Sequence, residues 1–490
     1  MNPRIFSSLF FLFFLVFSVQ AQNETDVLRY SQFDYGSTAR SMGVGSSLSA
    51  LGADFSVLSS NPAGLAWYRK PDFVFTPGFS SINTEALLTN DKSGGFFNES
   101  KTPFHLSNFG VVFASSPRSN NWRTFNFGLG FNRLSNFNRK VFFSGRSTGS
   151  ITDRFLELGN SSDELDGFES GPAFDAGALI CCDADDFYVT DFLSNPDAEV
   201  PKQQTITRGG SVNELVFSFA GNYNERLMIG ATLGVPFVSF TEEKIYREAD
   251  GGGGDDGDIP FFDELEYRED LTTTGTGINF KLGIIARPLQ MLRLGLAIHS
   301  PTAYKLEDTF NTEMFYTYTE NGAQNTGNGL SPDGLFDYKI NTPWRFIGSG
   351  GVIINKAGFL SGEVEYVDYG SATLGFSGFP DDERVANDSI QAKLGSAMNF
   401  KIGGEIAYEI FRFRAGFGLY QSPLIGDDIT NSAFSLGAGM REESFYLDIA
   451  YRRQSIKEAY APYVTTDYGS QVVETNTAFN QILFTLGFRF

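Results

Sequence analysis

The 490-residue chain has only two cysteines and two histidines. Cys181 and Cys182 are adjacent, which leaves no ordinary disulfide framework and no zinc-ligand pattern. After residue 21 no run of eighteen apolar residues occurs, so no membrane-spanning helix is predicted. Acidic residues outnumber basic ones, 58 to 37, and phosphate binding needs basic patches, so nucleic acid is not expected as a partner. We expect neither a metal nor a cofactor.

Phenylalanine, tyrosine and glycine are abundant, at 51, 20 and 53 residues, and this composition favours strands and tight turns. The clearest pattern is at the end of the chain. Ile482, Phe484, Leu486, Phe488 and Phe490 alternate with polar or small residues, which gives one strand an apolar face and a wet face. A membrane β-barrel is built entirely of such strands, with the polar face turned to a lumen.

Residues 1–21 are typical of a signal peptide, with Arg4 before an apolar stretch and a small-residue cleavage site at Val19-Gln20-Ala21. We therefore expect export. Because only helices and closed barrels satisfy their backbone groups in lipid, membrane residence would require a barrel. Gln22 follows the predicted cut, and the absence of cysteine there argues against a lipoprotein.

Residues 22–70 do not alternate, whereas alternation continues from Pro71 to the end of the chain. About fourteen strands are predicted, an even number that suits a bacterial barrel. The predicted strands are 71–82, 105–116, 122–137, 207–222, 225–246, 264–287, 289–318, 334–355, 357–376, 388–409, 411–424, 429–442, 443–458 and 474–490.

Short and long connections alternate along the predicted strands, and the longest connection covers residues 138–206. This is the pattern of an outer-membrane barrel with short periplasmic turns, longer extracellular loops and both termini in the periplasm. We predict an all-β protein with three parts: signal peptide 1–21, an N-terminal segment 22–70, and a transmembrane barrel 71–490. The terminal strand ending at Phe490 predicts recognition by the barrel-assembly machinery. A closed wall has no free edge, so we expect a monomer in the outer membrane of a Gram-negative bacterium, surrounded by its lipid.

Charged residues inside the predicted strands should face the lumen, because an arginine on the lipid side near the midplane costs about 2–4 kcal/mol. Arg412 and Arg414 alternate with Phe413, Ala415 and Phe417 in this way. The other residues expected to face inward are Glu363, Glu365, Lys401, Glu405, Glu409, Asp448 and Arg452. Mutual pairing, for instance of an arginine with Glu405 or Asp448, is the expected role.

The mature N-terminus resembles the long-chain fatty-acid outer-membrane transporter family, the FadL/TodX type. The resemblance rests on Gly36-Ser37-Thr38-Ala39-Arg40-Ser41-Met42-Gly43-Val44-Gly45, Ala50-Leu51-Gly52-Ala53-Asp54 and Asn61-Pro62-Ala63-Gly64-Leu65-Ala66. A second, weaker part of the resemblance is the segment Leu294-Gly295-Leu296-Ala297-Ile298-His299-Ser300-Pro301.

The resemblance implies a fourteen-stranded barrel with residues 22–70 folded into its lumen as a hatch. Asn61, Pro62, Ala63 and Gly64 would form a recognisable turn of the hatch, held because proline fixes one backbone angle and asparagine bonds nearby backbone. In the family a kink in the third strand opens a lateral exit. Carried over, Ser135, Asn136, Phe137 and Asn138 are the candidates.

The resemblance also implies passive uptake of hydrophobic small molecules, either long-chain fatty acids or aromatic hydrocarbons. An acyl chain gains about 0.8 kcal/mol per methylene on leaving water, so it needs apolar contacts and a polar group for its carboxylate. The candidates for capture are Phe155, Phe187 and Phe192, and those for the carboxylate are Arg412, Arg414 and Arg452.

Two other functions stay open. Some barrels similar to this family serve in protein secretion or surface attachment, where they bind exported proteins. An outer-membrane hydrolase is the least favoured function. His105 and His299 are the only histidines, and no Gly-x-Ser-x-Gly elbow is present, so we expect no enzyme.

Overall fold

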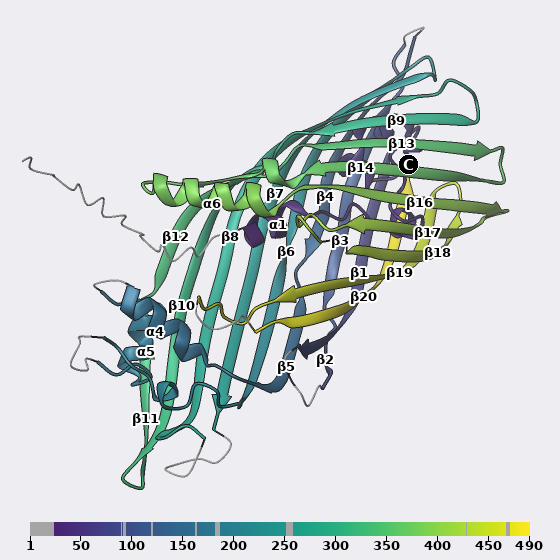
Figure 1. Ribbon diagram of the computed structural model, residues 1–490. Helices are drawn as coiled ribbons and strands as arrows, with labels where there is room; N and C mark the ends of the chain where they lie inside the picture. Colours follow the sequence, from purple (N-terminus) through teal and green to yellow (C-terminus); the bar gives the residue numbers. More distant parts are fainter. Residues whose placement is uncertain are drawn as a thin grey trace, which may run out of the picture.

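The computed structural model describes residues 24–490, except 90, 92–94, 119–120, 162–163, 182–186, 251–257, 428 and 467–470. The predicted signal peptide, residues 1–21, lies outside the described residues. The strands form one antiparallel sheet that closes on itself, because β1 (Asp72–Leu88) pairs with β3 (Phe104–Ser115) and also with the last strand, β20 (Val473–Arg489). The predicted closed barrel is confirmed (Figure 1).

The wall has fourteen positions, as predicted, and three of them consist of two successive strands. In order around the wall they are β1, β3, β4 (Trp122–Asn136), β6 (Val200–Tyr223), β7 (Leu227–Ala249), β8 (Phe262–Ala286), β9 (Leu292–His299) with β10 (Ala303–Glu320), β13 (Arg345–Ile354) with β12 (Gly334–Asn341), β14 (Gly358–Asp368) with β15 (Thr373–Phe376), β16 (Ser396–Tyr408), β17 (Phe411–Gln421), β18 (Thr430–Arg441), β19 (Phe445–Tyr460) and β20. The additional strands are β2 (Phe97–Lys101), β5 (Arg139–Ser147) and β11 (Ala323–Leu330). Among the described residues no helix is long and apolar enough to cross a bilayer.

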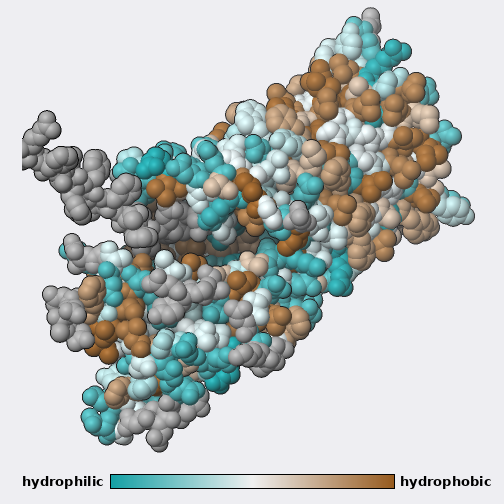
Figure 2. Space-filling model, viewed as in Figure 1, coloured by the Kyte–Doolittle hydropathy of each residue, from teal (hydrophilic) through white to brown (hydrophobic). Residues whose placement is uncertain are grey.

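Side chains alternate across the wall as the sequence predicts. Phe413 and Phe417 are 54% and 44% exposed on the outer face, whereas Arg414 between them is buried in the lumen. On β7 the outer face is apolar from Ile229 to Phe237 and polar at Ser239, Thr241 and Glu243. The apolar surface forms a band over the half of the barrel that contains the C-terminus, and a polar surface covers the other half (Figures 1 and 2). This is the construction of an outer-membrane barrel.

Several strands continue past the apolar band and carry a packed cap. Helices α4 (Ile151–Ser161) and α5 (Ser170–Asp175) and the short helix η2 (Asp191–Ser194) pack on the inner face of these extensions and share a core with them. The sequence predicts a single loop over residues 138–206. That prediction is wrong in part, because two segments within this range are strands. They are β5 and residues 200–206 of β6, and they pair with each other.

Two further predictions need correction. Residues 388–393 belong to helix α6 (Pro380–Lys393) and not to a strand, because Pro380 starts a helix whose first turn is acidic. Glu409 does not face the lumen. It is exposed in the turn between β16 and β17 and has φ of 50°, so its side chain reaches water at the rim.

The N-terminal segment lies inside the barrel. It contains α1 (Glu24–Ser31), α2 (Ala39–Gly43), α3 (Val57–Ser60) and the 3-10 helix η1 (Pro62–Trp67), and most of its side chains are buried. A last short helix, η4 (Tyr369–Ser371), joins β14 to β15. We call residues 24–68 the lumen segment.

Candidate functional site

The lumen segment is bonded to the wall by polar side chains on several strands. Ser59 Oγ donates to Glu214 on β6 at 2.7 Å, and the Ala39 N–H donates to Thr485 Oγ1 on β20 at 2.8 Å. Asn126 Nδ2 on β4 donates to the Leu65 carbonyl at 2.7 Å. Because Ser435 on β18 and Ser361 on β14 also bond the segment, through the Gly45 N–H and Ser47 Oγ, a rigid-body displacement would break hydrogen bonds on several sides at once.

The turn predicted at Asn61-Pro62-Ala63-Gly64 is formed. Asn61 caps η1 by accepting from the Ala63 N–H at 3.2 Å, and its Nδ2 donates to the Ser49 carbonyl at 2.9 Å. The turn lies so close to the wall that a β-carbon on Gly283 of β8 would stand 2.0 Å from the Asn61 amide oxygen. Glycine at this inward position lets the turn reach the barrel wall.

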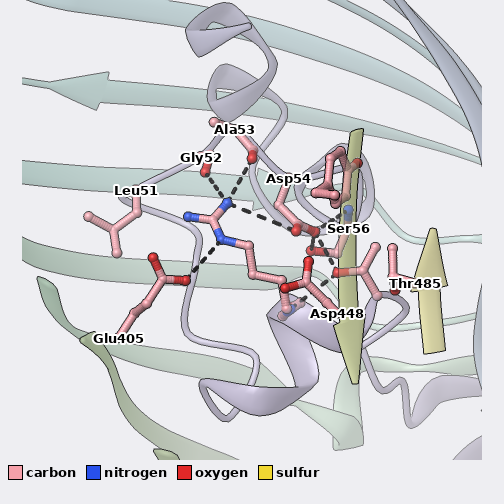
Figure 3. Close-up of polar contacts among 12 residues, drawn as sticks. Leu51, Gly52, Ala53, Asp54, Ser56, Glu405, Asp448 and Thr485 are labelled. Carbon is pink, nitrogen blue, oxygen red and sulfur yellow. Dashed lines mark hydrogen bonds and ion pairs between the residues drawn. The ribbon is translucent and has the colours of Figure 1, made fainter. Parts of the chain in front are cut away.

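A buried charge network joins α2 to the wall. Arg40 is 8% exposed, and its Nη1 donates to the Ala53 carbonyl at 2.7 Å. Its Nε lies 3.6 Å from Glu405 Oε2 on β16 (Figure 3). Arg414 on β17 donates to the same carboxylate at 2.7 Å and to Asp448 on β19 at 2.6 Å. Two arginines therefore share Glu405, one from the lumen segment and one from the wall.

The wall is interrupted between β3 and β4. Their register ends at the pair Asn108 and Asn132, although β3 begins at Phe104 and β4 runs to Asn136. Beyond this pair, β6 is the only strand in the described part of the chain that pairs with β4, and this pairing has a bulge between Arg133 and Ser135. The interruption overlaps the segment Ser135 to Asn138 that the sequence singles out as a strand break. We call the unpaired region between β3 and β4 the seam.

The lumen segment is bonded to the unpaired edge of β4. The Asp34 N–H donates to the Leu134 carbonyl at 2.7 Å, and Ser135 Oγ donates to the Gln32 carbonyl at 2.6 Å. Just beyond, the Phe137 ring packs edge-on against Tyr30 of α1 with ring centroids 6.0 Å apart. The segment thus occupies the edge that β3 leaves unpaired.

A cavity of about 390 Å³ lies beside α1 toward the polar half of the barrel. Asp26 and Arg29 of α1 face it, together with Arg208, Glu242 and Tyr460 from the wall. The Arg29 guanidinium lies over the Phe240 ring, with its Cζ 4.1 Å from the ring centroid. On its other side α1 joins an apolar cluster that contains Tyr30 and Leu134, so the helix separates the cavity from the seam.

The six residues predicted to bind ligand do not converge on one place. Phe155 and Phe192 are 0% and 4% exposed in the core of the cap, whereas Phe187 is 56% exposed. Arg414 and, more weakly, Arg412 approach Glu405, as the pairing alternative expects. Arg452 lies apart from them and pairs with Asp34 of the lumen segment.

Both histidines serve as hydrogen-bonding residues in the lumen. His299 Nε2 lies 2.6 Å from the Ser60 carbonyl and its Nδ1 lies 3.4 Å from the Tyr35 hydroxyl. His105 Nε2 lies 3.1 Å from the amide of Gln481. Among the described residues neither ring is hydrogen-bonded to a serine hydroxyl, which a Ser-His pair would require.

Sequence reasoning missed Arg40, Asp34 and Gln32 as contact residues. Arg40 lies within the motif that carries the family resemblance, so its position was available as a signal. Nothing local identifies Asp34 or Gln32, because their partners in β4 follow about a hundred residues later in the chain.

No family model and no curated sequence matches the chain. Solved structures do match it over nearly its whole length. A Pseudomonas aeruginosa FadL homologue has 16% identity and a TM-score of 0.53 over 92% of this chain and 98% of its own. The Pseudomonas putida toluene transporter TodX has 11% identity and a TM-score of 0.51 over 94% and 99%. The Ralstonia pickettii toluene transporter TbuX has 15% identity and a TM-score of 0.50 over 92% and 97%. The fold is therefore of the FadL/TodX type.

Proposed function

We propose that this FadL/TodX-type barrel is a passive outer-membrane channel for hydrophobic small molecules, with the lumen segment as its hatch. The observation that carries the proposal is the bonding of this segment to the unpaired edge of β4, through Asp34 and Leu134 and through Gln32 and Ser135. A wall interrupted beside a plug gives an apolar solute a way out through the side of the barrel. It also spares the solute a passage past the buried charges of Arg40, Glu405 and Arg414.

The proposed route has three parts in sequence. A solute enters the cavity beside α1, displaces the contacts of Tyr30 and Phe137, and leaves at the seam between β3 and β4. Apolar side chains line the middle step, and transfer of each methylene from water to such a surface is worth about 0.8 kcal/mol. Ser135, Asn136, Phe137 and Asn138 are the proposed exit residues.

Arg452 is proposed here to hold the hatch directly, because it pairs with Asp34 of the lumen segment. Arg412 and Arg414 are proposed to act indirectly, because they approach Glu405 of the wall, which Arg40 of the lumen segment also approaches. We do not assign them to substrate. Phe187 is retained as the exposed candidate for capture, whereas Phe155 and Phe192 would act by stabilising the cap.

Uptake by whole cells tests the function. Cells that carry the protein should accumulate radiolabelled oleate or toluene faster than cells with the empty vector, and without added energy. Equal rates in both strains would count against uptake. Specific recovery of exported proteins on the purified barrel, with no uptake, would instead support the secretion role. The solved structures that share the fold are named as transporters, which favours uptake.

A further inference from the structure

The charge of the chain is distributed very unevenly between the two ends of the barrel. The chain as a whole has a formal charge of −21. Seven connections form the end that contains the C-terminus, and five successive ones carry basic side chains, which are exposed in four of them. The residues are Lys70 before β1, Arg118 and Arg123 at the β3–β4 turn, Arg226 at the β6–β7 turn and Lys356 at the β13–β14 turn, with the half-buried Arg287 at the β8–β9 turn completing the series.

Acidic side chains are few along this series. Glu225 is already held by Arg69 at 2.6 Å and approaches Arg287 at 4.0 Å. The exposed acids Glu409, Glu442 and Glu443 belong to the two remaining connections, between β16 and β17 and between β18 and β19. We call Lys70, Arg118, Arg123, Arg226 and Lys356 the basic arc. Within the described residues none of the five has an ion-pair partner.

Aromatic residues beside the basic arc show where it lies along the membrane normal. Trp122 packs against Tyr223 and Phe125 with ring centroids 5.3 and 4.9 Å apart, at the edge of the apolar band. Tryptophan and tyrosine in such a position mark the level of the lipid headgroups. Because the turns are only a few residues long, Arg123 and Arg226 cannot extend far beyond this level.

We propose that the basic arc binds the phosphate groups of anionic phospholipids in the periplasmic leaflet. A phosphate accepts several charge-assisted hydrogen bonds from guanidinium and ammonium groups, and basic side chains near an anionic bilayer surface add roughly a five-fold gain in affinity each. The arc spans most of the rim, so it faces a lipid annulus and not a single contact point. Lipid binding keeps the part of the wall that contains the seam at a fixed depth in the membrane. The part of the rim with Glu409, Glu442 and Glu443 does not bind lipid phosphates in this way.

Lipid selectivity in nanodiscs tests this proposal. The full-length protein would be reconstituted in phosphatidylethanolamine with spin-labelled phosphatidylglycerol or spin-labelled phosphatidylethanolamine as the probe. We expect the protein to bind the phosphatidylglycerol probe several-fold more tightly, and raised salt to remove much of the difference. Equal binding of the two probes by the wild-type protein would overturn the proposal.

Two variants with the same change in charge identify the surface. The arc variant carries Lys70→Gln, Arg118→Gln, Arg226→Gln and Lys356→Gln. The control carries Lys305→Gln, Lys339→Gln, Arg453→Gln and Lys457→Gln, four exposed cations on the other side of the apolar band. Most of the selectivity should be lost in the arc variant, which keeps only Arg123 of the five cations, and the selectivity should persist in the control. If the arc variant keeps its lipid selectivity but no longer retains an acidic periplasmic protein, the surface docks a protein and the proposal is wrong.

Discussion

Asp34 links the unpaired edge of β4 to a strand on the far side of β1. Its N–H donates to the Leu134 carbonyl at 2.7 Å, while its carboxylate pairs with Arg452 on β19. One residue of the lumen segment therefore joins β4 at the seam to β19, from which β4 is separated in the wall by β3, β1 and β20. A displacement of Asp34 that frees the edge of β4 would also disturb its ion pair with Arg452, so we expect the proposed opening of the seam and the proposed movement of the hatch to be coupled.

A covalent bond between the lumen segment and β4, at Gln32 and Ser135, should stop transport. With Cys181 and Cys182 replaced by serine, a Gln32→Cys/Ser135→Cys variant should form a disulfide, because the Ser135 hydroxyl lies 2.6 Å from the Gln32 carbonyl. Oxidation should reduce uptake of a hydrophobic probe to the rate of empty proteoliposomes, and reduction should restore it. The two single variants, Gln32→Cys and Ser135→Cys, are the controls and should keep full uptake under the same oxidation. Full uptake by the oxidised protein would exclude hatch movement at β4.

Removing the shared carboxylate should weaken the hatch. Glu405→Gln leaves Arg40 and Arg414 without part of their buried counter-charge, and such losses cost about 3–5 kcal/mol. Urea unfolding in lipid vesicles measures the free energy of unfolding. The matched control is Asp388→Asn, whose carboxylate is 69% exposed and 3.6 Å from Arg384. In the Asp388→Asn variant the free energy of unfolding should change by no more than about 0.5 kcal/mol.

Gly283 should tolerate no side chain. Gly283→Val places its β-carbon 2.0 Å from Asn61 Oδ1, so the turn at Pro62 must move away from the wall. We expect a larger ion conductance in planar bilayers than that of the wild type, because the plug no longer fills the lumen. Gly348→Val is the control, since a β-carbon there meets no atom within 4 Å. Equal conductance of both variants would show that the turn does not seal the barrel.

The alternation of Phe413, Arg414 and Phe417 predicted the barrel. Strands that present apolar side chains to lipid and charged side chains to the other face can cross a membrane only as a closed barrel with a lumen. Short sequence patterns also predicted the Asn61 turn. They failed at residues 388–393, where Ile390, Ala392 and Leu394 alternate as in a strand while Pro380 and its acidic neighbours start a helix. The Arg40–Glu405 contact was out of reach, since it joins residues about 365 positions apart and depends on how the strands are tilted around the segment.

The cap should be more stable in acid. Burial raises the pKa of Asp153 in α4 from 3.8 to about 6, with nearby Glu248 acting in the same direction against Lys202. The folded cap therefore holds a proton that the unfolded cap releases, so this stabilisation is complete below about pH 4 and is lost as pH rises through 6. Proteolysis of residues 150–200 should be slower at pH 5 than at pH 7.5. Asp153→Asn should reduce this dependence, and an unchanged dependence would assign it to other groups.

The position of a bound substrate tests the proposed route most directly. A structure determined with a fatty acid brominated at its terminal carbon would locate the bromine by its anomalous signal. We predict a peak between α1 and β4, near Tyr30, Leu134 and Phe137. Peaks confined to the outer apolar band, with none in the lumen at a concentration that supports uptake, would contradict passage through the barrel.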